Sequence, residues 1–224
     1  MLSTPVDRIP DLLVQMKIDR AGFPFIAGAL LPAVLLVLFK RLPLAAPFAA
    51  LAGSLVFFFR DPDRSSPSEA EAVLSPADGR VVIAGDPQPG VAPPGEWRQV
   101  SIFLSPIDVH VNRIPVSGRV SRIEYRPGRY RPAYAPASGV ENERNEIWIE
   151  RDGGDLVVFR QITGVLVRRV VCRVRVGDEV RAGARFGVMK FGSRIDLFLP
   201  PAARLLVSPG DKVRGGETIL ARLA

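Results

Sequence analysis

Residues 176–183 read VGDEVRAG, and residues 209–216 repeat the pattern as PGDKVRGG. Each copy places a Gly-Asp turn before a short Val-containing segment and ends in another glycine. Glycine adopts turn conformations that other residues rarely reach, so each copy predicts a tight turn, a short strand and a second turn. This spacing is typical of small barrels built from interlocked β-hairpins.

The chain from Arg60 onward has the same β-rich character. Short runs of Val, Ile and Phe alternate with Gly, Pro and Asp, which favours a compact sandwich or hybrid barrel over βαβ units. We expect a mainly β fold, α+β at most, with surface loops at 87–94 and 127–142. The expected strands are residues 80–84, 99–104, 118–125, 146–150, 156–162, 165–176 and 195–199.

The first sixty residues differ in kind from the rest. Residues 22–39 and 42–59 contain no charged side chain, and each run is near the lower limit of the roughly 17–25 residues that span a bilayer. We therefore expect a membrane-associated domain over 1–60 and a separate β-rich domain over 61–224. The runs form either a membrane hairpin or two half-inserted helices, and buried core helices are the alternative in a soluble protein. Half-inserted helices would be broken at Pro24, Pro32, Pro43 and Pro47.

Charges beside the two apolar runs predict their orientation. Cytoplasmic flanks carry an excess of Lys and Arg, so both ends of the pair are expected on the cytoplasmic side of the cell (inner) membrane. The β-rich domain is then cytoplasmic as well. The flanking cations are Arg8, Lys17, Arg20, Arg60 and Arg64, against Lys40 and Arg41 in the turn.

Composition excludes several kinds of site. The single cysteine, Cys172, rules out an internal disulfide framework and any zinc site built on paired cysteines. The single histidine, His110, excludes zinc centres with two or three His ligands. The net charge of +7 favours an anionic partner. We expect phospholipid, and not nucleic acid, because the chain carries no nucleic-acid motif.

The only imidazole lies in an alternating stretch. If this stretch is a strand, Asp108, His110 and Asn112 share one of its faces. A lone histidine beside apolar residues is usually structural, although a polar trio on one face favours a functional interpretation.

Three other stretches carry reactive groups. Asp78 precedes a glycine and is more often a turn former than a catalyst. The Gly192–Ser193 pair combines a permissive backbone with a hydroxyl beside a peptide carbonyl. Residues 139–145 form a charged segment whose default interpretation is a solvated loop. No single stretch is decisive.

Five motifs in this order resemble the phosphatidylserine decarboxylase family, in its short bacterial and archaeal form. The resemblance covers the chain from about residue 56 to residue 200, and the apolar N-terminus fits it too. The motifs are residues 59–64 (FRDPDR), 75–79 (SPADG), 108–113 (DVHVNR), 142–145 (NERN) and 190–194 (KFGSR).

This resemblance implies self-cleavage between Gly192 and Ser193. The Ser193 hydroxyl would attack the Gly192 carbonyl, and the serine would become a covalent pyruvoyl cofactor. The products, a β chain of residues 1–192 and an α chain of residues 193–224, would remain together as a heterodimer. A Schiff base between the pyruvoyl group and phosphatidylserine would then release CO2 and leave phosphatidylethanolamine, without a metal. The implied partners are the phospholipid substrate and an anionic membrane surface, and a homo-oligomer is compatible.

The family pattern also implies residue roles. His110 would be the base that activates Ser193, and Asp78 would orient its imidazole. Longer family members carry a second histidine three positions further on, where this chain has Arg113. Either His110 serves both self-cleavage and decarboxylation, or Asp78 acts more directly with support from Arg113. Weaker candidates for substrate binding or support are Arg113, Asn112, Asn142, Glu143 and Arg144.

Two alternatives stay open. Arg126, Arg129 and Arg131 are candidates for binding the substrate phosphodiester, or are solvated loop cations. Residues 188–190 (VMK) are similar to the Met-Lys of biotin carriers, and the Gly-Asp repeat resembles biotinyl and lipoyl domains. The alternative function is therefore a non-catalytic carrier or scaffold with Lys190 as its modified residue.

Overall fold

The computed structural model describes residues 17–135, 137–165, 170–190 and 193–223. The chain divides into two compact units, one ending at Asp63 and the other beginning at Arg64. The sequence patterns place the boundary between residues 60 and 61, close to this division.

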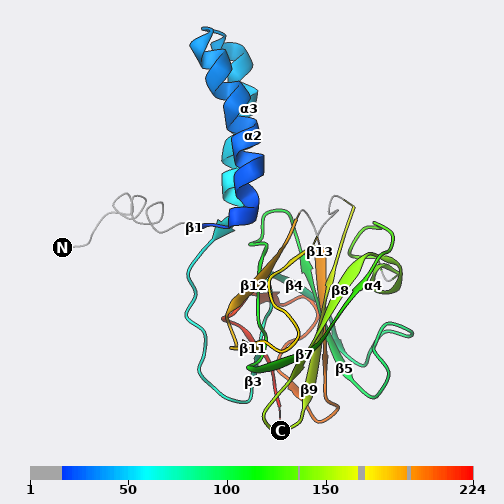
Figure 1. The fold of residues 1–224 in the computed structure, drawn as a ribbon. Coiled ribbons are helices and arrows are strands. Elements are labelled where there is room, and N and C mark those ends of the chain that lie inside the picture. Colours follow the sequence, from blue (N-terminus) through cyan, green and yellow to red (C-terminus); the bar gives the residue numbers. More distant parts are fainter. Residues whose placement is uncertain (1–16, 136, 166–169, 191–192, 224) are drawn as a thin grey trace, which may run out of the picture. The chain divides into compact units, whose positions relative to one another are not determined.

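The first unit is a helical hairpin whose base is closed by a short ribbon (Figure 1). Its helices are η2 (Arg20–Gly22), α2 (Phe23–Leu38) and α3 (Leu42–Phe58), and its strands are β1 (Lys17–Ile18) and β2 (Arg60–Asp61). β1 pairs antiparallel with β2, and Lys17 Nζ lies 2.9 Å from the carboxylate of Asp63. Gly22 is required at this base, because a Cβ there would lie 2.5 Å from the ring of Phe59.

Small side chains are buried in the hairpin and large apolar ones are exposed. Ala29, Ala33, Ala45 and Ala52 are buried, whereas Leu31 and Leu38 and most other large apolar side chains of the pair face outward. Close contact through alanines with an apolar exterior suits a helix pair in lipid. Among the described residues, Arg20–Leu38 is the one helix long and apolar enough to cross a membrane, with a mean hydropathy of 2.3.

The prolines do not interrupt these helices. Pro24 and Pro43 lie in the first turn, where the missing N–H would have had no helical partner. Pro32 and Pro47 lie inside helices that continue past them. The expectation of helices broken at the prolines is therefore wrong, and the hairpin alternative describes this unit.

The second unit is built on an eight-stranded antiparallel sheet with the order β11-β7-β8-β9-β13-β5-β4-β15. Two three-stranded sheets, β10-β12-β6 and β14-β16-β3, accompany it. The large sheet consists of β4 (Gly79–Gly85), β5 (Arg98–Leu104), β7 (Gly118–Arg126), β8 (Arg144–Glu150), β9 (Leu156–Ile162), β11 (Glu179–Val180), β13 (Ser193–Leu199) and β15 (Lys212–Val213). The other elements are β3 (Ala72–Leu74), β6 (Val111–Arg113), α4 (Ser138–Glu141), β10 (Val170–Cys172), β12 (Arg185–Met189), β14 (Arg204–Leu205) and β16 (Ile219–Arg222).

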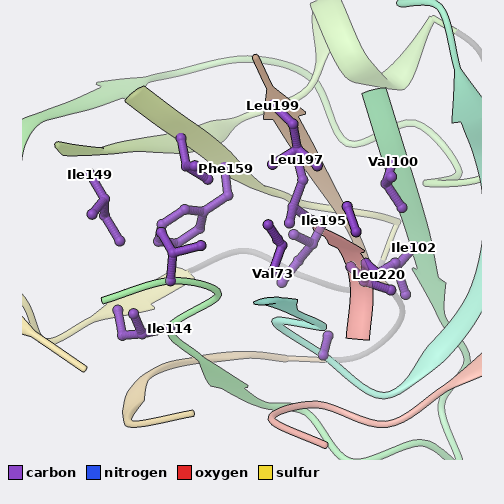
Figure 2. Close-up of a cluster of buried hydrophobic side chains, with 14 of the residues drawn as sticks. Val73, Val100, Ile102, Ile114, Ile149, Phe159, Ile195, Leu197, Leu199 and Leu220 are labelled. Atoms are coloured by element: carbon purple, nitrogen blue, oxygen red, sulfur yellow. The ribbon is translucent and has the colours of Figure 1, made fainter. Parts of the chain in front are cut away.

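The main core lies between one face of the large sheet and the small sheets. Ile102 of β5 and Ile195 of β13 meet Val73 of β3 and Leu220 of β16, and all four are fully buried (Figure 2). Because side chains alternate along a strand, Ser193 shares the core face with Ile195. The next side chains along β13 alternate to the opposite face.

The β-rich fold class with an N-terminal apolar segment is confirmed. The expectation of one long strand over residues 165–176 is wrong, because the strand found there is shorter. In the described part of this segment only Val170–Cys172 is a strand. The chain leaves the ladder there because Gly177 turns it toward β7, where its N–H donates to the carbonyl of Val120 at 2.8 Å.

Both copies of the sequence repeat make equivalent structures. The N–H of Gly177 donates to Val120, and the N–H of Gly210 donates to Val81, each at 2.8 Å. After these turns β11 pairs with the start of β7, and β15 pairs with the start of β4. The repeat therefore relates the hairpin β4–β5 to the hairpin β7–β8.

Candidate active site

Ser193 begins a central strand of the large sheet. It is fully buried, and its register partner on β5 is Leu104. Its Oγ is buried and has no hydrogen-bond partner among the described residues. A buried hydroxyl normally finds a partner, so this one is an exception that calls for a functional explanation. Gly192, the other half of the predicted cleavage site, lies outside the described residues.

His110 lies immediately before β6 and beside the chain segment that leads to Ser193. Its carbonyl accepts a hydrogen bond from the N–H of Met189, the last residue of β12. Its Nδ1 lies 2.9 Å from the carbonyl of Asp108. A carbonyl only accepts, so Nδ1 must donate, and a neutral ring then carries its lone pair on the buried Nε2. This is the tautomer that a general base requires.

Asp108 does not share a strand face with His110, because β6 begins only at Val111. Instead, the Asp108 carboxylate accepts hydrogen bonds from the Ser105 N–H and hydroxyl, at 2.8 and 2.7 Å. This turn fixes the backbone carbonyl that holds the imidazole. The predicted polar trio is thus divided between a turn and a strand.

Asn112 belongs to a buried amide pair beside β13. Its Oδ1 accepts a hydrogen bond of 2.8 Å from Nε2 of Gln161, whose register partner on β13 is Ile195. Its Nδ2 is buried and has no partner within the described part of the chain. Gly187 permits this arrangement, because a Cβ there would lie 2.9 Å from Nε2 of Gln161. One amide donor therefore remains available on the core side of the large sheet.

Asp78 is held by two donors. Its Oδ1 accepts from the N–H of Gly215 at 2.7 Å, and its Oδ2 accepts from Arg64 Nη2 at 2.9 Å. Burial raises the pKa of Asp78 above 3.8, partly offset by Gly215 and Arg64, while the charge of Asp108 raises it further. No hydrogen bond joins Asp78 to His110, both of which the structure describes.

The internal repeat shows which part of this arrangement is structural. Ser117 occupies the position equivalent to Asp78, before the glycine that begins β7. Its Oγ accepts from the N–H of Ala182 at 3.0 Å, as Asp78 accepts from Gly215. A serine hydroxyl is therefore sufficient to hold this turn. The turn does not require the carboxylate of Asp78.

A cavity of about 590 Å³ adjoins Asp78. Its lining includes the carboxylate residues Asp78 and Asp108 and the cations Arg80 and Lys212. It extends along β5 to Phe103, the neighbour of the residue that pairs with Ser193. It thus offers both signs of charge beside β5, and Phe103 lines it from the sheet face opposite to the Ser193 side chain.

Arg113 and Asn142 position the chain around this centre. Arg113 Nη1 donates to the carbonyl of Gly183 at 2.9 Å, at the end of the first repeat copy. Asn142 Nδ2 donates to the carbonyls of Arg131 and Thr163, each at 2.8 Å. Asn142 therefore ties the loop that contains Arg131 to the end of β9.

The remaining weak candidates lie in the same region. Glu143 accepts a hydrogen bond of 2.5 Å from the Tyr130 hydroxyl. Arg144 begins β8, lines a different cavity and donates to the carbonyl of Val140. Neither candidate lines the cavity beside Asp78.

The sequence analysis missed Gln161 and the cations Arg80 and Lys212. Gln161 had a usable signal, because it is an uncharged polar residue in the otherwise largely apolar run 156–162 (LVVFRQI). Arg80 and Lys212 had none, since only the pairing of β15 with β4 makes them register partners.

Two features suit an enzyme centre: a buried serine whose hydroxyl has no partner among the described residues, and a buried histidine, bonded through its backbone to the end of β12, whose Nδ1 contact leaves Nε2 as the acceptor. Together with the apolar hairpin, they define the class as a β-rich enzyme that carries an apolar helical segment. Comparison with known proteins specifies it further. The family model described as phosphatidylserine decarboxylase matches residues 51–221.

Three relatives named phosphatidylserine decarboxylase proenzyme agree with the family model. The Pelodictyon phaeoclathratiforme protein is 48% identical over 75% of this chain and 78% of its own. The Nitrosomonas europaea protein is 43% identical over 91% and 94%, and the Chlorobium phaeobacteroides protein is 44% identical over 95% and 93%. The chain belongs to the phosphatidylserine decarboxylase family. This confirms the resemblance found in its motifs.

Proposed function

We propose that this protein is a self-processing decarboxylase that converts phosphatidylserine to phosphatidylethanolamine and CO2. Family membership and the names of the relatives support the reaction and a proenzyme form. The observation that carries the proposal to this chain is Ser193, which begins a buried strand with a hydroxyl that has no described partner.

Self-cleavage begins when Ser193 Oγ attacks the Gly192 carbonyl carbon. The C–N bond breaks, and the Gly192 acyl group passes to the serine oxygen as an ester. A base then removes the Ser193 α-proton, so that the ester leaves as the Gly192 carboxylate. Water hydrolyses the resulting enamine, and ammonia departs to leave a pyruvoyl group at the new N-terminus. His110 serves as the base, because its Nδ1 contact with Asp108 leaves Nε2 as the acceptor.

The residues around Ser193 fit a pyruvoyl group. Such a group supplies a ketone that condenses with the substrate amine and accepts the electrons released by loss of CO2. The buried amide of Asn112 can donate to a carbonyl oxygen in this place, and Gln161 fixes its orientation. His110 can return a proton to the substrate carbon. No metal is proposed, and the described residues contain no group of three or more His, Cys, Asp or Glu suited to one.

Asp78 acts in this proposal as a proton-transferring group. Its raised pKa and its place in the cavity suit a carboxyl group that exchanges a proton with a ligand. The absence of a direct hydrogen bond to His110 favours the alternative in which Asp78 acts directly, with Arg113 fixing the adjacent turns. Arg80 and Lys212 would attract the lipid phosphate to the same cavity.

The other proposed residues support the site. Asn142 and Glu143 hold the loop around residues 130–131, and Arg144 holds the neighbouring carbonyl of Val140. The apolar hairpin would keep the enzyme at the membrane that contains its substrate. Its flanking charges predict that the second unit lies on the cytoplasmic side of the inner membrane. The two cleaved chains would stay together, because β13 is hydrogen-bonded between β9 and β5.

The test is the intact mass of the purified protein with a denaturing gel. We expect two chains, residues 1–192 and 193–224, the smaller with a ketone in place of its amino group. Ser193→Ala should leave one uncut, inactive chain. Ser101→Ala removes another fully buried serine of the large sheet and should be cut normally. An uncut chain with full activity would overturn the mechanism, and a mass increment on Lys190 of that chain would support the carrier alternative.

A further inference from the structure

A second, smaller cavity is lined by four arginines. It has a volume of about 180 Å³ and lies between β7, β8, β9 and the loop around residues 90–94. Its arginines sit on strands whose alternate residues, such as Ile147, face the main core. The cavity is therefore on the opposite face of the large sheet. The arginine cavity, as we call it, contains Arg122, Arg126, Arg144 and Arg160, with Glu124 and Glu146.

The two glutamates of the arginine cavity already form ion pairs with three of its four arginines. Glu124 accepts hydrogen bonds from Arg122 at 2.5 Å and from Arg126 at 2.6 Å. Glu146 is paired with Arg160 in a buried ion pair. Four arginines and two glutamates leave an excess positive charge in a partly enclosed space.

Arg144 is the arginine without a carboxylate partner among the described residues. Its Nη1 donates to the backbone carbonyl of Val140 at 2.5 Å, and its Nε is buried without a described partner. Burial lowers the pKa of Arg144, and the nearby charges of Arg160 and Arg126 lower it further. An anion in the cavity would satisfy the Nε donor and relieve the repulsion among the three cations.

The cover of the cavity is fixed before any ligand arrives. Val91 is buried against Val158 and Phe198, which anchors the loop to the sheet. Trp97 Nε1 donates to the carbonyl of Pro94 at 3.2 Å, and two consecutive prolines limit the backbone in between. A preorganised cavity loses little conformational entropy when it binds a ligand.

The cavity is separate from the proposed reaction centre. Arg144 lies on β8, and β9 separates this strand from β13. Ser193 faces the core side of the sheet, whereas the arginine cavity lies on the other side. A ligand in the cavity would not contact the Ser193 side chain.

We propose that the arginine cavity binds the phosphate group of an anion. The planar guanidinium fork matches phosphate oxygens in pairs, and several forks around one cavity favour phosphate over a single halide. The cavity volume of about 180 Å³ is large enough for a phosphate group, since one water molecule occupies about 30 Å³ in the liquid. The phosphate can come from free inorganic phosphate or from an anionic phospholipid headgroup. The proposal does not depend on decarboxylation.

The test is isothermal titration of the detergent-solubilised full chain at constant ionic strength. One series adds inorganic phosphate, and another adds dihexanoyl phosphatidylglycerol with dihexanoyl phosphatidylcholine as the zwitterionic control. Arg144→Gln should weaken binding about tenfold or more, the factor expected for losing a charged hydrogen-bond donor. Arg126→Gln changes a half-exposed side chain, so it should fold normally and weaken binding as well. The matched control is Arg119→Gln, the same charge change at an exposed position of β7 outside the cavity.

The two series distinguish the sources of the phosphate. Arginine-dependent binding of inorganic phosphate supports a free-phosphate site, and arginine-dependent binding of phosphatidylglycerol alone supports a headgroup site. Binding that Arg119→Gln weakens as much as Arg144→Gln does would show general attraction to a basic surface and overturn the proposal. Absence of binding in both series would overturn it as well.

Discussion

Replacing Asp78 with serine separates its structural role from its chemical one. In the repeat copy the equivalent Ser117 holds the turn by accepting the N–H of Ala182 at 3.0 Å. In Asp78→Ser, the new hydroxyl can accept the N–H of Gly215 in the same way. We therefore expect a folded protein that has lost only the carboxylate.

The structure sets the size of the effect on stability. Arg64 would lose its 2.9 Å pair with Asp78 but keep its 3.0 Å pair with Glu217, so it would not become an unpaired buried charge. The desolvation that raises the pKa of Asp78 would also disappear. These effects oppose each other, and the free energy of unfolding should change by no more than about 1 kcal/mol.

The effect on self-cleavage should be much larger. A proton-transferring group contributes at least about 100-fold to a rate, so Asp78→Ser should slow cleavage by that factor or more. Cleavage is followed on gels after cell-free synthesis. Stability is measured by urea unfolding with tryptophan fluorescence, using Ser193→Ala as the background so that every variant remains one chain.

Ser117→Ala is the matched control. It removes the equivalent turn hydrogen bond and should cost about 1 kcal/mol, while cleavage proceeds at the normal rate. If Asp78→Ser folds as expected and is cut at the normal rate, the carboxylate has no chemical role and the reasoning is refuted. If Asp78→Ser is destabilised by several kcal/mol, the equivalence of the two turns is refuted.

Three further predictions each concern one residue. The pKa of Asp78 is raised above 3.8 in the folded state, so the free energy of unfolding should fall as pH rises from 3.8 to the raised value. Urea unfolding at several pH values should show a smaller fall in Asp78→Asn. Asp196 is fully buried and lies 2.5 Å from Arg194, its ion-pair partner. Arg194→Gln removes this partner and should lower the free energy of unfolding in urea by about 3–5 kcal/mol, whereas a loss below about 1 kcal/mol would contradict the buried pair. In Gly187→Ala the new Cβ meets the Val171 carbonyl, so unfolding should become about 1–3 kcal/mol easier, and an unchanged midpoint would contradict this packing.

Much of the site could be predicted from local patterns. The five motifs predicted Ser193, His110 and Asp78 as site residues, and the Gly-Asp repeat predicted two equivalent turns. The runs without charge predicted the apolar hairpin, because spanning a bilayer depends on length and hydropathy alone. The turns and the hairpin each reside in a short stretch of chain, so the amino-acid sequence by itself was sufficient to determine them.

Only the tertiary structure revealed the partners of these residues. Asn112 meets Gln161 because the small sheet that contains β6 packs against the large sheet that contains β9, although neither strand's sequence encodes the other's position. The pairing of Asp78 with Arg64 and the arginine cavity arise in the same way. Strand alternation sets the face on which a side chain lies, but the order of strands depends on how the whole core packs. For that reason the sequence patterns could propose candidate reactive residues, whereas the contacts around these residues required the folded chain.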